Sequence, residues 1–78
     1  MEIKITAPNG NSTLITTRDQ ENNFPCQINH VSSTEEQPFI AINFDANGNC
    51  VGGRTLQKSA MENIVKVSKN NGWKIEGE

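Results

Sequence analysis

The sequence predicts an α+β domain, an antiparallel sheet of four to six strands with one helix, at about residues 59–71, packed on one face as a two-layer sandwich. Three observations predict this class. Apolar and polar residues alternate in several short segments, as in half-buried strands. Two pairs of these segments are joined through Asn-Gly, the dipeptide that most favours hairpin turns. A later stretch changes to the spacing of an amphipathic helix. A chain of 78 residues is expected to form a single domain, residues 1–78.

The first half of the chain predicts three strands and their connections. The strands are expected over residues 2–7, 13–17 and 24–31. A turn cluster at residues 8–11 and polar loops at residues 18–23 and 32–37 connect them. Ile3 and Ile5 give the first strand one dry face. Pro25 lacks a backbone N–H, so the third strand starts there or lies at an edge of the sheet.

The strongest local signal is a hairpin in the middle of the chain. Ile40, Ile42 and Phe44 lie two residues apart and therefore share one face of a strand. Asn47-Gly48 favours a two-residue turn, which pairs Cys50-Val51 back against that strand.

The helix follows this hairpin. Its apolar stripe comprises Leu56, Ala60, Ile64 and Val67, widened by Met61 and Val65. Ser59 and Glu62 have the spacing of a capping box, so the helix is expected to begin near Ala60. Gly72 suits a left-handed C-terminal cap, and residues 73–76 are the last strand candidate. Trp73, directly after the cap, is expected to pack on Val67 at the helix end, and stacking on a ligand is the alternative.

Part of this stretch resembles a known family. Residues 39–71 contain Asn47-Gly48, Val51-Gly52, Ser59-Ala60, Glu62-Asn63-Ile64 and Val67. In this respect the segment, less than half of the chain, resembles the small ββα units of YegP-like proteins. Those units usually carry a tyrosine where this chain has Leu56, and they typically occur in tandem, whereas the chain has one. The resemblance implies a hairpin laid on a helix and implies no chemistry.

Composition excludes several classes of function. Nine acidic and seven basic side chains are interspersed and give a net charge of −2, so no basic stripe is available for direct binding of nucleic acid. No run of eighteen apolar residues is present and the chain opens on a strand pattern, which favours a soluble cytoplasmic protein with no membrane contact. The apolar fraction is 33%, so we expect the core to use these residues and to leave no room for a ligand pocket.

The two cysteines are the most reactive candidates. Cys26 and Cys50 are widely separated, and in a reducing compartment we expect free thiols that behave as small hydrophobic residues. A Cys26–Cys50 disulfide and a redox or metal-binding role are the alternatives. His30 is the only histidine, too few for a metal site, and it lies too far along a strand to contact Cys26. Contact with Cys50 across strands remains open. We therefore expect no catalytic residues, no metal and no other cofactor.

Acidic side chains on two polar loops give the main functional hypothesis. The candidate partner-binding residues are Asp19, Glu21, Glu35 and Glu36, together with the exposed Arg54. They favour a non-enzymatic module that binds a larger protein through its basic surface. Short acidic α+β proteins of this type include inhibitors that phages encode against host nucleic-acid-handling machinery, such as CRISPR systems, a likeness of type only. The alternative is a thiol-dependent enzyme or redox protein using Cys26 or Cys50. The protein is expected to be a monomer or a homodimer through an edge strand, either the strand of Ile3 or that of Pro25.

Overall fold

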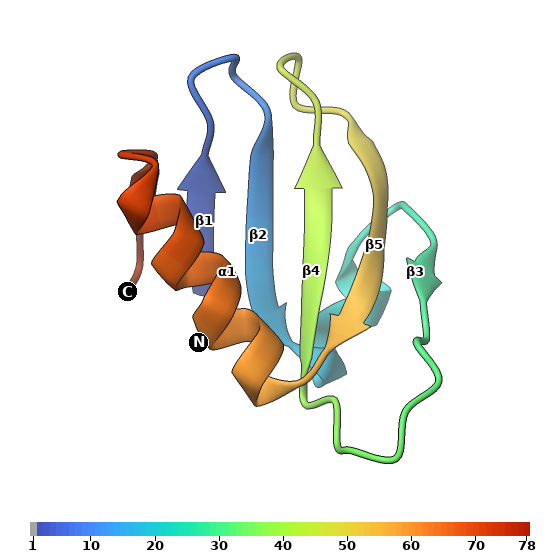
Figure 1. The fold of residues 1–78 in the computed structure, drawn as a ribbon. Coiled ribbons are helices and arrows are strands. Elements are labelled where there is room, and N and C mark those ends of the chain that lie inside the picture. Colours follow the sequence, from blue (N-terminus) through green and yellow to red (C-terminus); the bar gives the residue numbers. More distant parts are fainter. Residues whose placement is uncertain (1) are drawn as a thin grey trace.

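The computed structural model describes residues 2–78 as one six-stranded sheet with one helix across a face (Figure 1). The elements are β1 (Glu2–Thr6), β2 (Ser12–Thr17), the 3-10 helix η1 (Arg18–Asn23), β3 (Ile28–Asn29), β4 (Phe39–Phe44), β5 (Cys50–Leu56), α1 (Lys58–Asn70) and β6 (Lys74–Glu76). The strand order is β3-β5-β4-β2-β1-β6. The predicted α+β class, the sheet and the single helix are confirmed.

The sheet is mixed, whereas the sequence predicted an antiparallel one. Four pairings are antiparallel, and β3 runs parallel to β5. Only Ile28 and Asn29 of the expected strand 24–31 pair in the sheet, and the expected loop 18–23 forms η1. The reason is the path of the chain, since η1 and the residues after it lie on the side of the sheet away from α1 (Figure 1). The chain then reaches the outer edge of β5 in the same direction as that strand.

The main core lies between α1 and the sheet. It comprises Ile3, Ile5, Ile15, Ala41 and Leu56 from the strands and Met61 and Val65 from the helix. The cross-strand partners Ile3, Ile15 and Ala41 lie in one row, which is the alternation expected of half-buried strands. Along the helix, the buried face runs through Met61, Val65 and Ser68. The expected stripe is therefore displaced, and Val67 is 47% exposed.

A second buried layer covers the opposite face. Ile40 and Ile42 have no exposed surface and alternate with Ala41, so they point away from α1. Thr16, the cross-strand partner of Ile40, is buried with them. Beyond β4, a Cβ atom at Gly53 would lie only 2.7 Å from Ile28 Cδ1, so β3 packs directly against the backbone of β5. The residues between β2 and β4 therefore partly cover the face that a two-layer sandwich would leave open.

Both hairpin turns have three-residue loops, and not the two-residue loop expected at Asn47-Gly48. The Asp45 N–H donates to Asn49 O, and the Gly48 N–H donates to Asp45 O. Gly48 then has a φ of 83°, so the loop is a type I turn followed by a left-handed glycine. The first turn has the same two bonds, since the Ala7 N–H donates to Asn11 O and the Gly10 N–H donates to Ala7 O.

The helix begins two residues before the expected Ala60. Lys58 is its first residue, and the cap residue Gln57 makes no side-chain capping bond. The predicted capping box of Ser59 and Glu62 is therefore wrong. The Gln57 side chain donates instead to Ser33 Oγ at 2.8 Å, which ties the helix start to the loop before β4.

The C-terminal cap is confirmed. Gly72 has a φ of 73°, its N–H donates to Lys69 O, and the Trp73 N–H donates to Ser68 O. This pair of bonds is the Schellman motif, which satisfies carbonyl groups of the last helical turn and reverses the chain into β6.

Candidate functional site

The four candidate carboxylates gather at one end of the sheet. Asp19 and Glu21 lie on η1, which follows the end of β2, and Glu35 and Glu36 precede the start of β4. Thr17 and Phe39 are cross-strand partners, so these two segments leave the sheet at the same end. The Arg18 N–H also donates to Pro38 O at 3.0 Å, which links the two segments directly. We call Asp19, Glu21, Glu35 and Glu36 the acidic end.

Asp19 is exposed and held in its charged form. The Thr17 hydroxyl donates to its carboxylate, and this hydrogen bond is the main cause that lowers the pKa of Asp19 from 3.8. The Gln20 side chain contributes a longer bond in the same direction. Asp19 therefore presents a negative charge to solvent over the whole physiological pH range.

Glu21 has a structural partner. Its carboxylate lies 2.8 Å from His30 Nε2, and the Arg18 guanidinium lies 3.1 Å from His30 Nδ1. Because a guanidinium can only donate, Nδ1 of the neutral ring accepts and Nε2 carries the proton that is donated to Glu21. His30 thus connects η1 with the residues after β3, and its two ring nitrogens are occupied without either cysteine.

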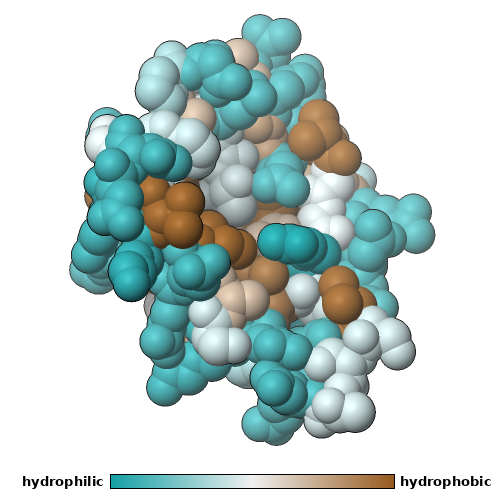
Figure 2. Space-filling view, in the orientation of Figure 1, coloured by the Kyte–Doolittle hydropathy of each residue, from teal (hydrophilic) through white to brown (hydrophobic). Residues whose placement is uncertain are grey.

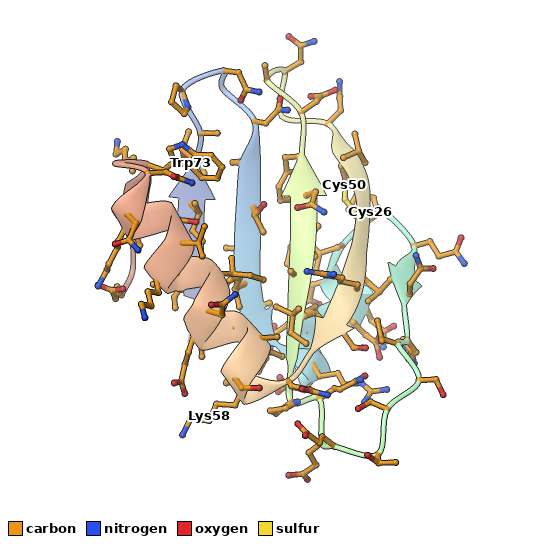
Figure 3. All side chains as sticks on the ribbon, viewed as in Figure 1. Cys26, Cys50, Lys58 and Trp73 are labelled. Atoms are coloured by element: carbon orange, nitrogen blue, oxygen red, sulfur yellow. A yellow bond between two sulfur atoms is a disulfide. The ribbon has the colours of Figure 1, made fainter. Side chains whose placement is uncertain are left out.

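Glu35 and Glu36 are exposed at the start of the helix. They line a shallow depression together with Lys58 and Glu62. Glu62 is a further carboxylate that the sequence reasoning assigned to the capping box, and Lys58 is the basic residue beside the group (Figure 3). Glu62 could have been identified from its position one turn after the start of α1, because that start lies beside the loop that carries Glu35 and Glu36.

Arg54 does not join the acidic end. It lies on β5 opposite Ala41, and is exposed on the face of the sheet that carries α1. The alternation of β5 places Arg54 and Leu56 on the same side, which is why the guanidinium points toward the helix side.

The expectation of free thiols is wrong, because Cys26 and Cys50 form a disulfide (Figure 3). The bond joins residues separated by 24 positions, with Cα atoms 5.9 Å apart. This distance lies within the usual range for disulfides. The cause is the parallel pairing of β3 with β5, which brings the residues just before β3 next to the start of β5. Sequence spacing alone could not show this proximity.

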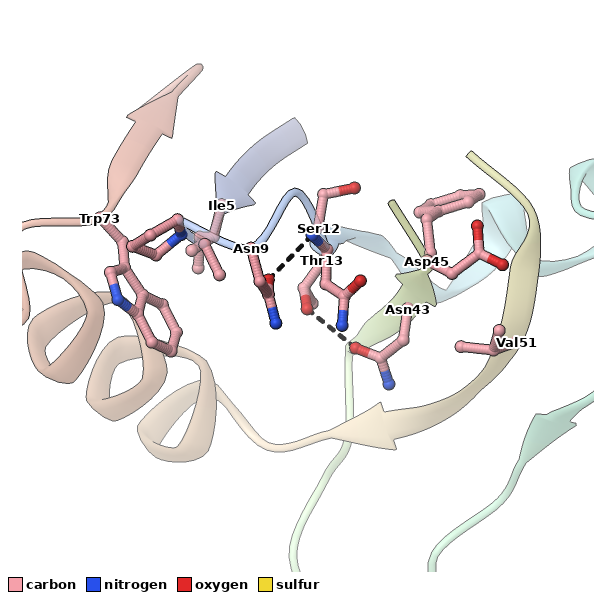
Figure 4. Close-up of a pocket in the computed structure, with 12 residues that line it drawn as sticks. Ile5, Asn9, Ser12, Thr13, Asn43, Asp45, Val51 and Trp73 are labelled. Atoms are coloured by element: carbon pink, nitrogen blue, oxygen red, sulfur yellow. Dashed lines mark hydrogen bonds between the residues drawn. The ribbon is translucent and has the colours of Figure 1, made fainter. Parts of the chain in front are cut away.

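A surface groove is the feature that the sequence reasoning missed. We expected no room for a pocket, but a groove of about 610 Å³ opens on the face of the sheet that carries α1. Trp73 lies at one end and Val51 at the other, with Thr13 and Asn43 between them (Figure 4). We call it the Trp73 groove. In the space-filling view of this face, apolar side chains form separate patches among hydrophilic ones (Figure 2).

Residues 2–78 contain neither a cluster of metal ligands nor a membrane-spanning helix. No three histidine, cysteine or carboxylate side chains lie close enough together to hold a metal ion within these residues. Nor does this part of the chain contain a helix long and apolar enough to cross a membrane.

Together these features define a small α+β domain with one disulfide, an acidic end and an open groove. Comparison with protein-family models, with curated proteins and with solved structures finds no match for the chain. The hairpin and helix implied by the YegP-like resemblance are present as β4, β5 and α1. Membership of that family stays a prediction.

Proposed function

We propose that the protein is a non-enzymatic binding module that acts by contact with a larger protein through that protein's basic surface. The observation that supports this function is the gathering of two acidic segments at one end of a disulfide-bonded sheet. Carboxylates fixed on such a scaffold speed the encounter with a positively charged partner and determine its orientation.

The acidic residues have different roles in this proposal. Glu35 and Glu36 are exposed and have no ion pair among the described residues, so they make the first contacts with the partner. Asp19 adds a charge that its own hydrogen bonds stabilise. Glu21 positions η1 through His30. Arg54, on the adjoining face, contributes a separate contact with a carboxylate of the partner.

A narrower form of the proposal is an inhibitor encoded by a phage or another mobile element. Such a protein would cover the basic surface with which host machinery of the CRISPR type handles nucleic acid. Its acidic end supplies the same sign of charge as a phosphate backbone. In this form the protein acts in the host cytoplasm, where disulfides are seldom maintained, so the fold must hold with Cys26 and Cys50 reduced.

The test is affinity capture from a bacterial lysate followed by mass spectrometry, with Glu35→Lys/Glu36→Lys as the variant. The matched control is Glu76→Lys/Glu78→Lys, which changes the charge equally. Glu76 is the last residue of the edge strand β6, and Glu78 follows that strand. We expect the wild type and the control to recover one large basic partner, and the E35K/E36K variant to lose it. Equal recovery by all three proteins, or no large partner with the wild type, would reject the proposal.

A second candidate function, a redox protein, is favoured by the disulfide itself. Both cysteines are only partly buried, so a reductant can reach the bond. A thiol-dependent enzyme would need that reduction first, because the thiolate and not the disulfide is the nucleophile. Turnover of a disulfide substrate in the presence of dithiothreitol, lost in Cys26→Ser, would support this function, and wild-type rates no faster than dithiothreitol alone would reject it.

The oligomeric state is proposed to be monomeric. The sheet edges are β3 and β6, so the strand of Ile3 is not an edge. These edges contain two and three paired residues, and edges this short offer little backbone for strand addition. Light scattering that gives twice the chain mass would favour the edge-strand homodimer instead.

A further inference from the structure

We propose that the Trp73 groove is a binding site for a neutral oligosaccharide. The groove crosses β1, β2, β4 and β5 through Ile5, Thr13, Asn43 and Val51. Three interstrand spacings give it a length of about 14 Å, which is longer than a single sugar ring. The inference does not depend on the acidic end, because none of the acidic-end residues lines the groove.

The groove has one aromatic platform. Trp73 is 37% exposed, and the Schellman bonds at the helix end fix its backbone. An indole face carries negative charge density and attracts the weakly positive C–H groups that cover one face of a sugar ring. Phe44 also lines the groove. Because residues two positions apart in β4 share a face, its side chain points with that of Ile42 to the face of the sheet opposite α1. A sugar ring can therefore stack at one position in the groove, on the indole of Trp73.

The polar groups of the groove are oriented donors. The Thr13 hydroxyl donates to Asn43 Oδ1 at 2.8 Å, and the Asn11 N–H donates to Asn9 Oδ1 at 3.0 Å (Figure 4). Each bond fixes the amide through its oxygen and leaves the Nδ2 group without a partner among the described residues. Two amide donors are thus available between the walls formed by Trp73 and Val51. Sugar hydroxyl oxygens can accept hydrogen bonds from these Nδ2 groups.

Charge selects a neutral ligand. No lysine or arginine lines the groove, so an anionic ligand would lose its hydration without a counter-charge. Asp45 is the one carboxylate in the lining, and its Oδ1 atom accepts hydrogen bonds from the backbone N–H groups of Asn47 and Asn49. The Asp45 carboxylate therefore forms its hydrogen bonds within its own turn. The ligand is recognised through stacking and hydrogen bonds.

A proline-rich peptide is the competing occupant, because its carbonyl groups would also accept from the asparagines. Peptides of this kind dock in grooves lined by several aromatic side chains. The Trp73 groove offers one such platform, which is why the oligosaccharide is favoured.

The experiment titrates chitotriose, maltotriose and decaproline into the protein by calorimetry and by NMR of the Trp73 indole N–H. The same titrations are repeated by calorimetry with the test variants Trp73→Ala and Asn43→Ala. Asn43 is exposed, so its replacement leaves the core intact if Trp73→Ala fails to fold. The matched controls are Val67→Ala and Asn70→Ala, exposed positions on α1 outside the groove lining.

We expect saturable binding of at least one trisaccharide, a shift of the Trp73 resonance, and affinity at least tenfold weaker in Asn43→Ala with unchanged affinity in both controls. Two results would overturn the proposal. One is the absence of saturable binding of either sugar at millimolar concentration, and the other is binding that Asn43→Ala leaves unchanged. Binding of decaproline alone would assign the groove to a peptide. Retained sugar binding in E35K/E36K would separate this site from the acidic end.

Discussion

Replacing Cys26 and Cys50 by serine is expected to lower the melting temperature by about 20 °C. The disulfide closes a loop with a sequence separation of 24, and the loss of chain entropy on closing such a loop is worth about 3.5 kcal/mol. A chain of 78 residues unfolds with an entropy of about 0.16 kcal/mol/K. Dividing the first quantity by the second gives the expected shift.

The loss should be concentrated in the segment that the bond anchors. Without it, β3 is held by its short pairing with β5, by the Gly53 N–H donating to Gln27 O at 3.2 Å and by the Val31 N–H donating to the Thr55 hydroxyl at 2.9 Å. Hydrogen exchange should therefore accelerate in residues 24–31 well before it does in β1 and β2.

The assay is thermal unfolding followed by circular dichroism, with hydrogen exchange read by mass spectrometry. Wild-type protein treated with a phosphine reductant is the control, because it should match the serine variant without any change of sequence. A fall of less than about 5 °C, or equal exchange in residues 24–31 with and without the bond, would refute the reasoning, because the segment would then be ordered by packing alone.

Three other predictions concern single residues. Gly53→Ala should destabilise the fold by about 1–3 kcal/mol, since its methyl group would lie 2.7 Å from Ile28 Cδ1, and the change should be read by urea unfolding. Gly72→Ala should cost about 1 kcal/mol by the same measurement, because the left-handed cap strains any residue with a Cβ. The pKa of Asp45 is lowered from 3.8, chiefly by a hydrogen bond from a backbone N–H of its own turn, so this bond stabilises the fold above pH 3.8 and is lost as the pH falls through the folded-state value. The melting-temperature difference between wild type and Asp45→Ala should therefore be present at pH 7 and shrink below pH 3.8; a difference that stays constant with pH would contradict this assignment.

The parts of the fold that sequence reasoning found are those determined by local chemistry. Ile3, Ile5 and Ile42 lie on buried faces because apolar residues two positions apart share one side of a strand. Gly72 ends the helix because it readily adopts the left-handed conformation that the cap needs. Each of these signals lies within a few residues of the feature that it predicts.

The parts that it missed depend on contacts between distant segments. The capping box at Ser59 satisfies a local rule, but the bond from Gln57 to Ser33 joins the helix start to a loop 24 residues earlier. The parallel pairing of β3, and with it the Cys26–Cys50 bond, follows from the route of the chain behind the sheet.

The candidate site divides in the same way. Exposed carboxylates on polar loops could be identified one by one, and hairpin order then places the loops at a common end. The Trp73 groove could not be found, because its lining comes from β1, β2, β4, β5 and Trp73, which are spread along most of the chain. Two signals were available, the isolated polar residue Asn43 in an otherwise apolar strand and Trp73, for which ligand stacking was the alternative to packing.

The pairing of β1 with β6 makes the two ends of the described chain spatial neighbours. During synthesis, β1 leaves the ribosome before β6 and must wait for that strand before both of its edges are hydrogen-bonded. Until then its outer edge is open to strands of other molecules. Circular permutation should remove this delay, since a short linker could join the adjacent ends and new termini could be opened in the exposed loop at residues 32–36.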